Sequence, residues 1–273
     1  MGNATRWSLS QARRREPAGA QSVCTSGAPI QGNAMKPSDR VTSLYTEMYS
    51  QGVERGFRDA GAADKANNIV RIWTEAGLPP LPRVVELGCG EGAIADALAQ
   101  RGFAETYSGY DISESGIEEA RGRKILGASF HVVAGESMPL GDDSADLVVL
   151  SHVVEHLEHP RALLYEARRI ATHVIVEVPL ELNARLPRDY VWNELGHINK
   201  YTATSIRQLV QTCDLEMVAE FTSNPSKEHA LFGSRSLKRQ AQWHVKELAL
   251  AVAPRIGRSL FTYHETLLAR RPS

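Results

Sequence analysis

Short apolar runs alternate with helix-like segments along the chain from Pro82 onward. The runs are rich in β-branched residues, as strands buried in a parallel sheet are. Five of them precede residue 181, at 83–89, 105–112, 129–135, 145–151 and 173–180. Residues 91–102 and 113–125 carry apolar side chains at helical spacing, and Ser113 is expected to cap the second of these helices. The alternation predicts an α/β fold with a mostly parallel sheet and helices on both faces.

The pattern loosens in the second part of the chain. Residues 181–201 have no regular period, which predicts a long loop insertion. Thr202 or Thr204 is expected to cap the helix that follows. Two further runs, 216–223 and 260–270, would complete a seven-stranded, Rossmann-like sheet.

Helices are also predicted outside this alternation. Residues 41–57 and 65–78 are expected to form two helices over the edge of the sheet, and residues 224–259 a helical, lid-like segment before the last strand. One stripe in the last segment has helical spacing and is interpreted as core packing: Leu237, Ala241, Val245, Leu248 and Val252.

The amino-terminal part of the chain differs in composition. Residues 1–34 contain few large apolar side chains, so they cannot offset the entropy lost on ordering. We predict a disordered extension over residues 1–38 and one domain over residues 39–273. A transit peptide would have a similar composition, but an extension upstream of a natural start at Met35 is the favoured interpretation.

Composition and charge exclude several classes of protein. With 273 residues, 42% of them hydrophobic, the chain can bury a sizeable core, and its net charge of −1 gives no overall attraction to nucleic acid or anionic membranes. Cys24, Cys89 and Cys213 are far apart, which predicts neither a disulfide framework nor a cysteine zinc site and fits a reducing cytoplasm. No apolar run approaches the roughly 20 residues of a membrane span.

A glycine-rich segment, ELGCGEG at 86–92, ends the first predicted strand and opens the first predicted helix. Its glycines allow a tight turn and a close approach of a ligand at the carboxyl edge of the sheet. Asp111 follows at the end of the next strand, about 20 residues later, where a carboxylate can bind the hydroxyls of a ribose. The spacing predicts a nucleotide-type site.

The sequence argues against two classes of nucleotide site, a dinucleotide site and the ATP site of a P-loop enzyme. The pattern is G-x-G-x-G instead of the dinucleotide pattern G-x-G-x-x-G, and Glu86 stands two residues before the first glycine. A carboxylate there would repel a pyrophosphate but suits a ligand with an ammonium and a sulfonium group. The chain also lacks the P-loop pattern of ATP hydrolysis.

Three segments, VVELGCGEG at 84–92, GYDIS at 109–113 and residues 132–160, resemble the class I S-adenosylmethionine-dependent methyltransferases. Within that family they are most similar to the branch of ubiquinone-pathway and natural-product or sugar O-methyltransferases. The resemblance covers roughly residues 40–220. It implies a class I methyltransferase fold over residues 39–273, S-adenosylmethionine as cofactor, and methyl transfer to an acceptor.

The resemblance also implies a set of cofactor-binding residues: Glu86, Gly88, Cys89, Gly90, Asp111, Ile112, Gly135, Glu136, Ser151, Tyr45 and Tyr49. Asp111 would hold the ribose, and Gly135 and Glu136 would lie along the adenine. Ala134 stands where relatives usually carry an aspartate that contacts the adenine amine, so that contact is either missing or made by Glu136. Tyr45 and Tyr49 would close over the cofactor or else pack on the sheet.

The segment SHVVEHLEHP at 151–160 contains H-x-x-E-H, the pattern of one class of zinc peptidases, in His152, Glu155 and His156. A zinc helix needs both histidines on one helical face, but His152 directly follows a predicted strand and should precede the helix. A zinc hydrolase is therefore disfavoured, and no metal ligands are assigned. In the resembling family the Glu-His pair opens this helix, and some quinol O-methyltransferases use a divalent cation near it, which leaves a metal role open.

Methyl transfer to an alcohol needs a base, and histidine suits that task. His197 in the loop insertion is the leading candidate, although its ring could instead bond only within its loop. His152 is expected to line the methyl group, and Glu181 and Tyr201 the acceptor pocket. The expected acceptor is a hydroxyl oxygen of a small molecule or glycan. Nucleic acid is disfavoured, because the basic residues near Arg239 lack interleaved aromatic side chains.

Two other functions remain compatible with these residues. An NAD(P)-linked oxidoreductase would use the same kind of sheet. A methyltransferase-like protein without catalytic activity would bind the cofactor and transfer nothing.

Overall fold

The computed structural model describes residues 55–135, 137–191, 196–234 and 236–272. The predicted extension at 1–38, most of the predicted helix at 41–57, and the predicted cofactor residues Tyr45, Tyr49 and Glu136 lie outside the described residues.

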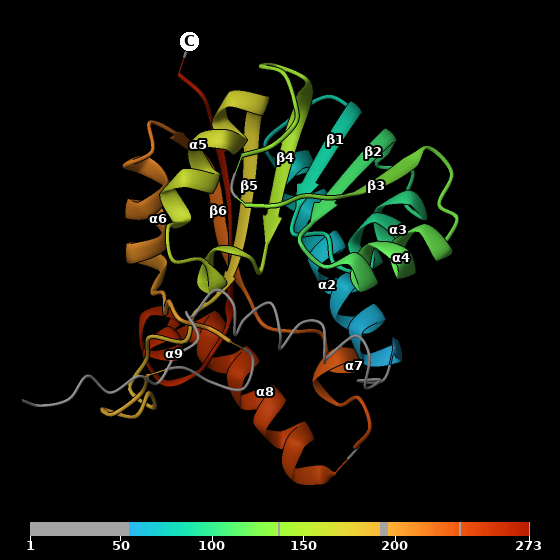
Figure 1. The fold of residues 1–273 in the computed structure, drawn as a ribbon. Helices are drawn as coiled ribbons and strands as arrows, with labels where there is room; N and C mark the ends of the chain where they lie inside the picture. Colours follow the sequence, from blue (N-terminus) through green and yellow to red (C-terminus); the bar gives the residue numbers. More distant parts are fainter. Residues whose placement is uncertain (1–54, 136, 192–195, 235, 273) are drawn as a thin grey trace, which may run out of the picture. The chain divides into compact units, whose positions relative to one another are not determined.

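The core of the fold is a sheet of seven strands in the order β3-β2-β1-β4-β5-β7-β6 (Figure 1). The strands are β1 (Leu81–Leu87), β2 (Ala104–Asp111), β3 (Ala128–Val132), β4 (Ala145–Ser151), β5 (Ala171–Pro179), β6 (Glu216–Ser223) and β7 (His264–Arg270). Strands β1 to β5 are parallel, and β7 runs antiparallel between β5 and β6. The predicted Rossmann-like, mostly parallel sheet is confirmed. The strand order reverses between β1 and β4, the place where ligands bind in open α/β sheets.

Helices cover both faces of this sheet, as predicted (Figure 1). One face packs against α2 (Arg55–Glu75), α3 (Ala93–Ala99) and α4 (Glu114–Gly122), and the other against α5 (Pro160–Ile170) and α6 (Ala203–Gln211). Successive residues of β4 face opposite sides of the sheet, so both sides are apolar. Leu147 and Val149 pack in the core beneath α2, α3 and α4, and Val148 and Leu150 pack in the core beneath α5 and α6.

Two predicted helix caps are present. The Ser113 side chain accepts a hydrogen bond from the Gly116 N–H and begins α4. Of the two threonines considered, Thr202 caps α6, because its hydroxyl and that of Ser205 form a reciprocal capping box.

The helix predicted at 65–78 is part of α2, which contacts β7 and the edge strand β6, with Ile69 and Ile72 fully buried. One predicted boundary was wrong. The segment 260–270 is not one strand, since it begins with the end of α9 (Pro254–Leu260) and β7 starts only at His264.

The interpretation of the stripe at 237–252 as core packing was also wrong. Its residues lie on α8 (Leu237–Val252), no residue of that helix is buried, and Leu237 is 83% exposed. Periodicity identified the helix but could not show which surface its apolar side faces. Together with α7 (Lys227–Ala230), α8 and α9 form the predicted helical segment, and α8 and α9 lie beyond the carboxyl ends of the parallel strands (Figure 1). A lid role for this segment stays a prediction.

None of the helices in the described part of the chain combines the length and the apolar composition of a membrane span.

Candidate active site at the carboxyl edge of the sheet

The glycine-rich loop connects β1 to α3. Gly88, Gly90 and Gly92 have φ angles of 81°, 51° and 72°, in the left-handed region that favours glycine. A Cβ atom at Gly88 would lie 2.4 Å from Cγ2 of Val153, which follows β4. The loop therefore lies directly against the chain leaving β4, which brings the two predicted ligand-binding segments together.

Asp111, at the end of β2, holds this loop in place. Its Oδ2 atom accepts a hydrogen bond from the Gly90 N–H at 2.7 Å, and its Oδ1 atom accepts one from the Ser113 N–H at 2.8 Å. Burial raises the pKa of Asp111, and these hydrogen bonds oppose the rise. The side chain remains half-buried, so it is accessible to a ligand at the edge.

The surroundings of Asp111 fit a nucleoside. The apolar side chain of Ile112 is 45% exposed. Gly135 is exposed with a φ angle of 84°, and a Cβ atom there would meet nothing within 4 Å. A half-buried carboxylate thus lies between a glycine-rich loop and an exposed apolar side chain, and the residues present fit S-adenosylmethionine.

Glu86 and Cys89 are buried in the interior. Glu86 is 1% exposed, and its Oε2 atom accepts a hydrogen bond from the Tyr107 hydroxyl at 2.6 Å. Burial raises the pKa of Glu86 to about 7 and raises the pKa of the Cys89 thiol well above its usual range. A direct contact between these two side chains and a cofactor stays a prediction.

Ser151, the last residue of β4, is the other predicted cofactor residue at this edge. It is 5% exposed, and its hydroxyl has no hydrogen-bond partner among the described residues. A buried hydroxyl is usually paired, so Ser151 is available to a ligand.

Helix α2 is attached to the glycine-rich loop by a bidentate ion pair. Arg58 donates from Nε and Nη2 to the two carboxylate oxygens of Glu91, at 2.8 and 2.7 Å. Arg123, from the end of α4, also donates to Glu91 at 3.1 Å. Both side chains of the Arg123–Glu91 pair are 4% exposed. The loop is therefore held by charges from two helices.

The segment with H-x-x-E-H does not form a zinc helix. His152 has a left-handed φ angle of 58°, and its N–H donates to the Glu177 carbonyl at 2.8 Å. Glu155 and His156 lie in a short 3-10 helix, η1 (Val154–His156), and α5 begins only at Pro160. The expectation that this pair occupies the first turn of the long helix was wrong, because Pro160 at the start of α5 fixes that start later.

Glu155 and His156 are both buried, and burial shifts the pKa of each side chain. Burial raises the pKa of Glu155 to about 8, and neither of its carboxylate oxygens has a hydrogen-bond partner among the described residues. Burial lowers the pKa of His156 to about 3, and its Nδ1 atom lies 3.2 Å from the Gly196 carbonyl oxygen. At neutral pH both side chains are therefore uncharged.

His197 comes from the loop insertion and reaches the same edge. Its Nδ1 atom lies 2.7 Å from Oε2 of Glu181, and Lys200 also donates to that oxygen. The His197 and His156 rings are perpendicular neighbours with centroids 4.7 Å apart. The loop is fixed to η1, since the N–H groups of Ile198 and Asn199 both donate to the Glu155 carbonyl.

Tyr201, a predicted acceptor-pocket residue, is 7% exposed, and its hydroxyl donates to the Val154 carbonyl at 3.3 Å. Tyr201 therefore supports η1. Glu181 and His197 are brought together beside His156, whereas the Tyr201 hydroxyl contacts η1.

Two residues of this edge, Glu177 and His264, were missed by sequence reasoning. Glu177 interrupts the apolar run HVIVEVPL at 173–180. An acid inside a strand buried on both faces was the available signal, because a buried carboxylate needs partners. His264 carried no such signal.

Comparison with known proteins identifies the family. A model of the methyltransferase domain matches residues 56–220. A Mycolicibacterium smegmatis protein named "Probable S-adenosylmethionine-dependent methyltransferase" is 30% identical over 137 residues, covering 49% of this chain and 52% of that protein. The ubiquinone biosynthesis O-methyltransferase of Alkalilimnicola ehrlichii is 27% identical over 121 residues, covering 42% of this chain and 47% of that protein.

The chain spans about half the length of the curated relatives it matches. Among solved structures, a chain from the complex between the Haloferax volcanii Trm112 methyltransferase activator and its methyltransferase is similar with a TM-score of 0.59. That match covers 84% of this chain and 98% of the other at 18% identity, which shows the fold. Because the family model spans more than half of the residues, the chain belongs to the methyltransferase domain family, whose methyl donor is S-adenosylmethionine.

Proposed function

We propose that the chain transfers the methyl group of S-adenosylmethionine to a hydroxyl oxygen of a small-molecule or glycan acceptor, with His197 as general base. The observation that carries the proposal is the short contact of 2.7 Å between His197 Nδ1 and Glu181 Oε2 at the carboxyl edge of the sheet. A carboxylate that orients an imidazole is the usual arrangement for a histidine base.

The pair has the electrostatics that a base requires. Burial acts to raise the pKa of Glu181, but hydrogen bonds from His197 and Lys200 outweigh it and lower the pKa. Glu181 is therefore ionised at neutral pH and accepts the proton on Nδ1 of His197. This selects the tautomer with its lone pair on Nε2, and it stabilises the imidazolium after proton uptake from the acceptor.

The other residues of the edge position the cofactor, which when bound supplies an electrophilic methyl group. In this proposal the loop of Gly88 and Gly90 lies along the methionine portion, Asp111 binds the ribose, and Ile112 and Gly135 flank the adenine. His152 and Ser151, at the end of β4, line the methyl group. Alignment of acceptor, methyl group and sulfur supplies most of the rate enhancement.

The choice of an oxygen acceptor is supported by two features. One relative carries a name that specifies O-methyl transfer. An alcohol also has a proton to lose, which gives the His197–Glu181 pair a function. The segment 224–259 is proposed to cover an extended acceptor.

A labelled-methyl assay against sugars, phenols, carboxylic acids and nucleic acid tests the acceptor class. His197→Asn and Glu181→Gln are expected to lower kcat by about 10² to 10⁴ while leaving the affinity for S-adenosylmethionine unchanged, because proton removal contributes a factor of that size. His159→Asn is the matched control, since His159 is exposed at the start of α5.

Three results would contradict the proposal. Unchanged turnover in both variants removes His197 from the base role. Binding of S-adenosylmethionine without transfer to any acceptor indicates a protein that is not catalytic. Calorimetric binding of NAD(H) in place of S-adenosylmethionine indicates an oxidoreductase.

A further inference from the structure

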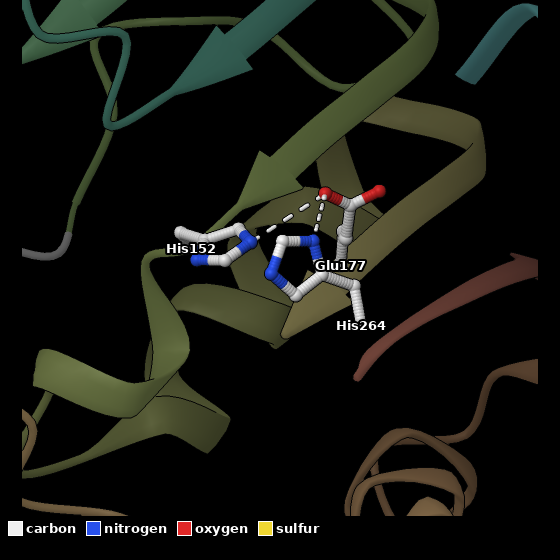
Figure 2. Close-up of side chains that lie close together, drawn as sticks. All are labelled: His152, Glu177 and His264. Atoms are coloured by element: carbon white, nitrogen blue, oxygen red, sulfur yellow. Dashed lines mark ion pairs between the residues drawn. The ribbon is translucent and has the colours of Figure 1, made fainter. Parts of the chain in front are cut away.

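Three side chains from β4, β5 and β7 or their ends meet at the carboxyl edge of the sheet. His152 directly follows β4, Glu177 lies in β5, and His264 is the first residue of β7. Strand β7 runs antiparallel to β5, with His264 opposite Pro179. Figure 2 shows both imidazole rings turned toward the Glu177 carboxylate. We call this group the His-Glu-His cluster.

The Glu177 carboxylate is fully buried, and among the described residues only one of its two oxygens accepts hydrogen bonds. Its Oε2 atom accepts hydrogen bonds from Asn68 Nδ2 at 3.0 Å and from Thr266 Oγ1 at 2.8 Å. Its Oε1 atom lies 3.5 Å from Nε2 of His152 and 4.0 Å from Nδ1 of His264 (Figure 2). One oxygen is thus fixed by donors, and the other points into the gap between the two rings.

This gap contains unpaired polar atoms. Glu177 Oε1 and His152 Nε2 are buried and have no hydrogen-bond partner among the described residues. Leaving a buried polar atom unpaired costs roughly 1 to 3 kcal/mol, more when it is charged. A group bound between the rings would satisfy both atoms.

The protonation states match a cation ligand set better than an ion pair. Burial lowers the pKa of His264 to about 3 and that of His152 well below its usual range. Both rings are therefore neutral near pH 7, with a lone pair on one nitrogen of each. Neutral imidazole nitrogens together with a carboxylate oxygen bind zinc and similar divalent transition metals.

The spacing of the donors is compatible with one ion. The donor atoms of the three side chains all lie within 4.8 Å of one another. Ligand atoms around a tetrahedral zinc ion are about 3.3 Å apart. The 3.5 Å between His152 and Glu177 is close to this value, and His264, at 4.0 Å from Glu177 Oε1, must approach by about 0.7 Å. A cavity of about 160 Å³ is lined by one of the three ligands, His264, and by Asn68, which supports Glu177.

We propose that the His-Glu-His cluster binds one divalent transition-metal ion of the zinc type through His152 Nε2, Glu177 Oε1 and His264 Nδ1. Three protein ligands leave a position for an outside oxygen ligand, as in catalytic zinc sites. The site shares His152 with the proposed active site but contains neither His197 nor Glu181, and its metal binding can be measured without methyl transfer. Mg²⁺ is excluded as the preferred ion, because it favours oxygen ligands.

The test uses the full chain, treated with a chelator and dialysed, and titrated with Zn²⁺ by calorimetry and with Co²⁺ by visible absorption. The expected result is tight Zn²⁺ binding and an intense tetrahedral Co²⁺ spectrum with histidine ligation, neither reproduced by Mg²⁺. Glu177→Gln and His264→Asn are each expected to weaken Zn²⁺ binding by more than about 100-fold. Thr266→Val removes one of the two hydrogen bonds to Glu177 Oε2, and it is expected to weaken binding by about 10-fold.

The neighbouring group of Glu155, His156 and His197 provides the matched control, since its donor atoms also lie within 4.8 Å of one another. His156→Asn is expected to keep the Zn²⁺ affinity. Absence of Zn²⁺ binding, or binding lost in His156→Asn but kept in Glu177→Gln and His264→Asn, would overturn the proposal. Circular dichroism checks each fold, and His152→Asn replaces Glu177→Gln if that variant does not fold.

Discussion

Asp111 and Gly90 are joined by a hydrogen bond of 2.7 Å from the Gly90 N–H to Oδ2 of Asp111. The acid at the end of β2 therefore shapes the glycine-rich loop as well as being the proposed ligand of the ribose. One side chain connects the two motifs from which the nucleotide site was predicted.

Asp111→Asn is expected to weaken the binding of S-adenosylmethionine by roughly 10- to 100-fold, because a hydrogen bond to a charged group contributes about 1.5 to 3 kcal/mol. Calorimetry with S-adenosylmethionine and S-adenosylhomocysteine measures it. Asp142→Asn is the control, since Asp142 is 75% exposed and pairs only with Arg169 among the described residues. Equal affinities in the two variants would remove Asp111 from the cofactor site.

Gly88→Ala is expected to destabilise the fold by about 2 kcal/mol or more. Its Cβ atom would lie 2.4 Å from Val153 Cγ2, and its φ angle of 81° adds backbone strain of about 1 kcal/mol. Val153→Ala removes the clashing methyl groups, so the double variant should recover part of the loss relative to additivity. Urea unfolding of the four proteins measures the coupling, and strict additivity would show that the close approach does not limit this site.

Glu86 makes the stability depend on pH. Its pKa of about 7 in the folded protein exceeds the usual value of 4.5. The folded state therefore keeps a proton that the unfolded state loses, and the stabilisation present below pH 4.5 is lost as the pH rises toward 7.

The stabilisation from Glu86 that is lost over this pH range amounts to roughly 3 kcal/mol. Glu86→Gln should abolish this pH dependence. Between pH 5 and 8 the unfolding free energy of the variant should therefore rise relative to that of the wild type. Urea titrations at both pH values measure the difference. A pH-independent difference would mean that Glu86 ionises normally in the fold.

Glu91→Ala is expected to cost about 3 to 5 kcal/mol, because it leaves the arginines of two helices without their shared carboxylate in a buried place. Glu75→Ala is the control: its pair with Arg71 is exposed on α2, and such pairs contribute about 0.5 kcal/mol. Chemical unfolding compares the two. A loss below 1 kcal/mol in Glu91→Ala would show that the loop does not need these charges.

The strands and the glycine-rich loop could be predicted because their signals are local. β4 and β6 have the bounds that the apolar runs indicated, and Asp111 lies where the motif spacing placed it. The family resemblance was confirmed by the match over residues 56–220, whereas the particular branch was not.

What could not be predicted depends on contacts between distant parts of the chain. The exposure of Leu237 on α8 depends on which surface the helix meets, which periodicity does not specify. His264 joins His152 only because β7 inserts beside β5. Glu155 was placed in a long helix, since the sequence could not show that η1 and Pro160 separate it from α5.

The position of β7 between β5 and β6 affects the order in which the fold can form during synthesis. β6 leaves the ribosome first, but among the described strands its only partner is β7. Until Arg270 has emerged, both β5 and β6 present unpaired backbone edges on which a nascent chain can associate with its neighbours. Chaperone demand should therefore be highest over the interval in which α7, α8 and α9 are translated.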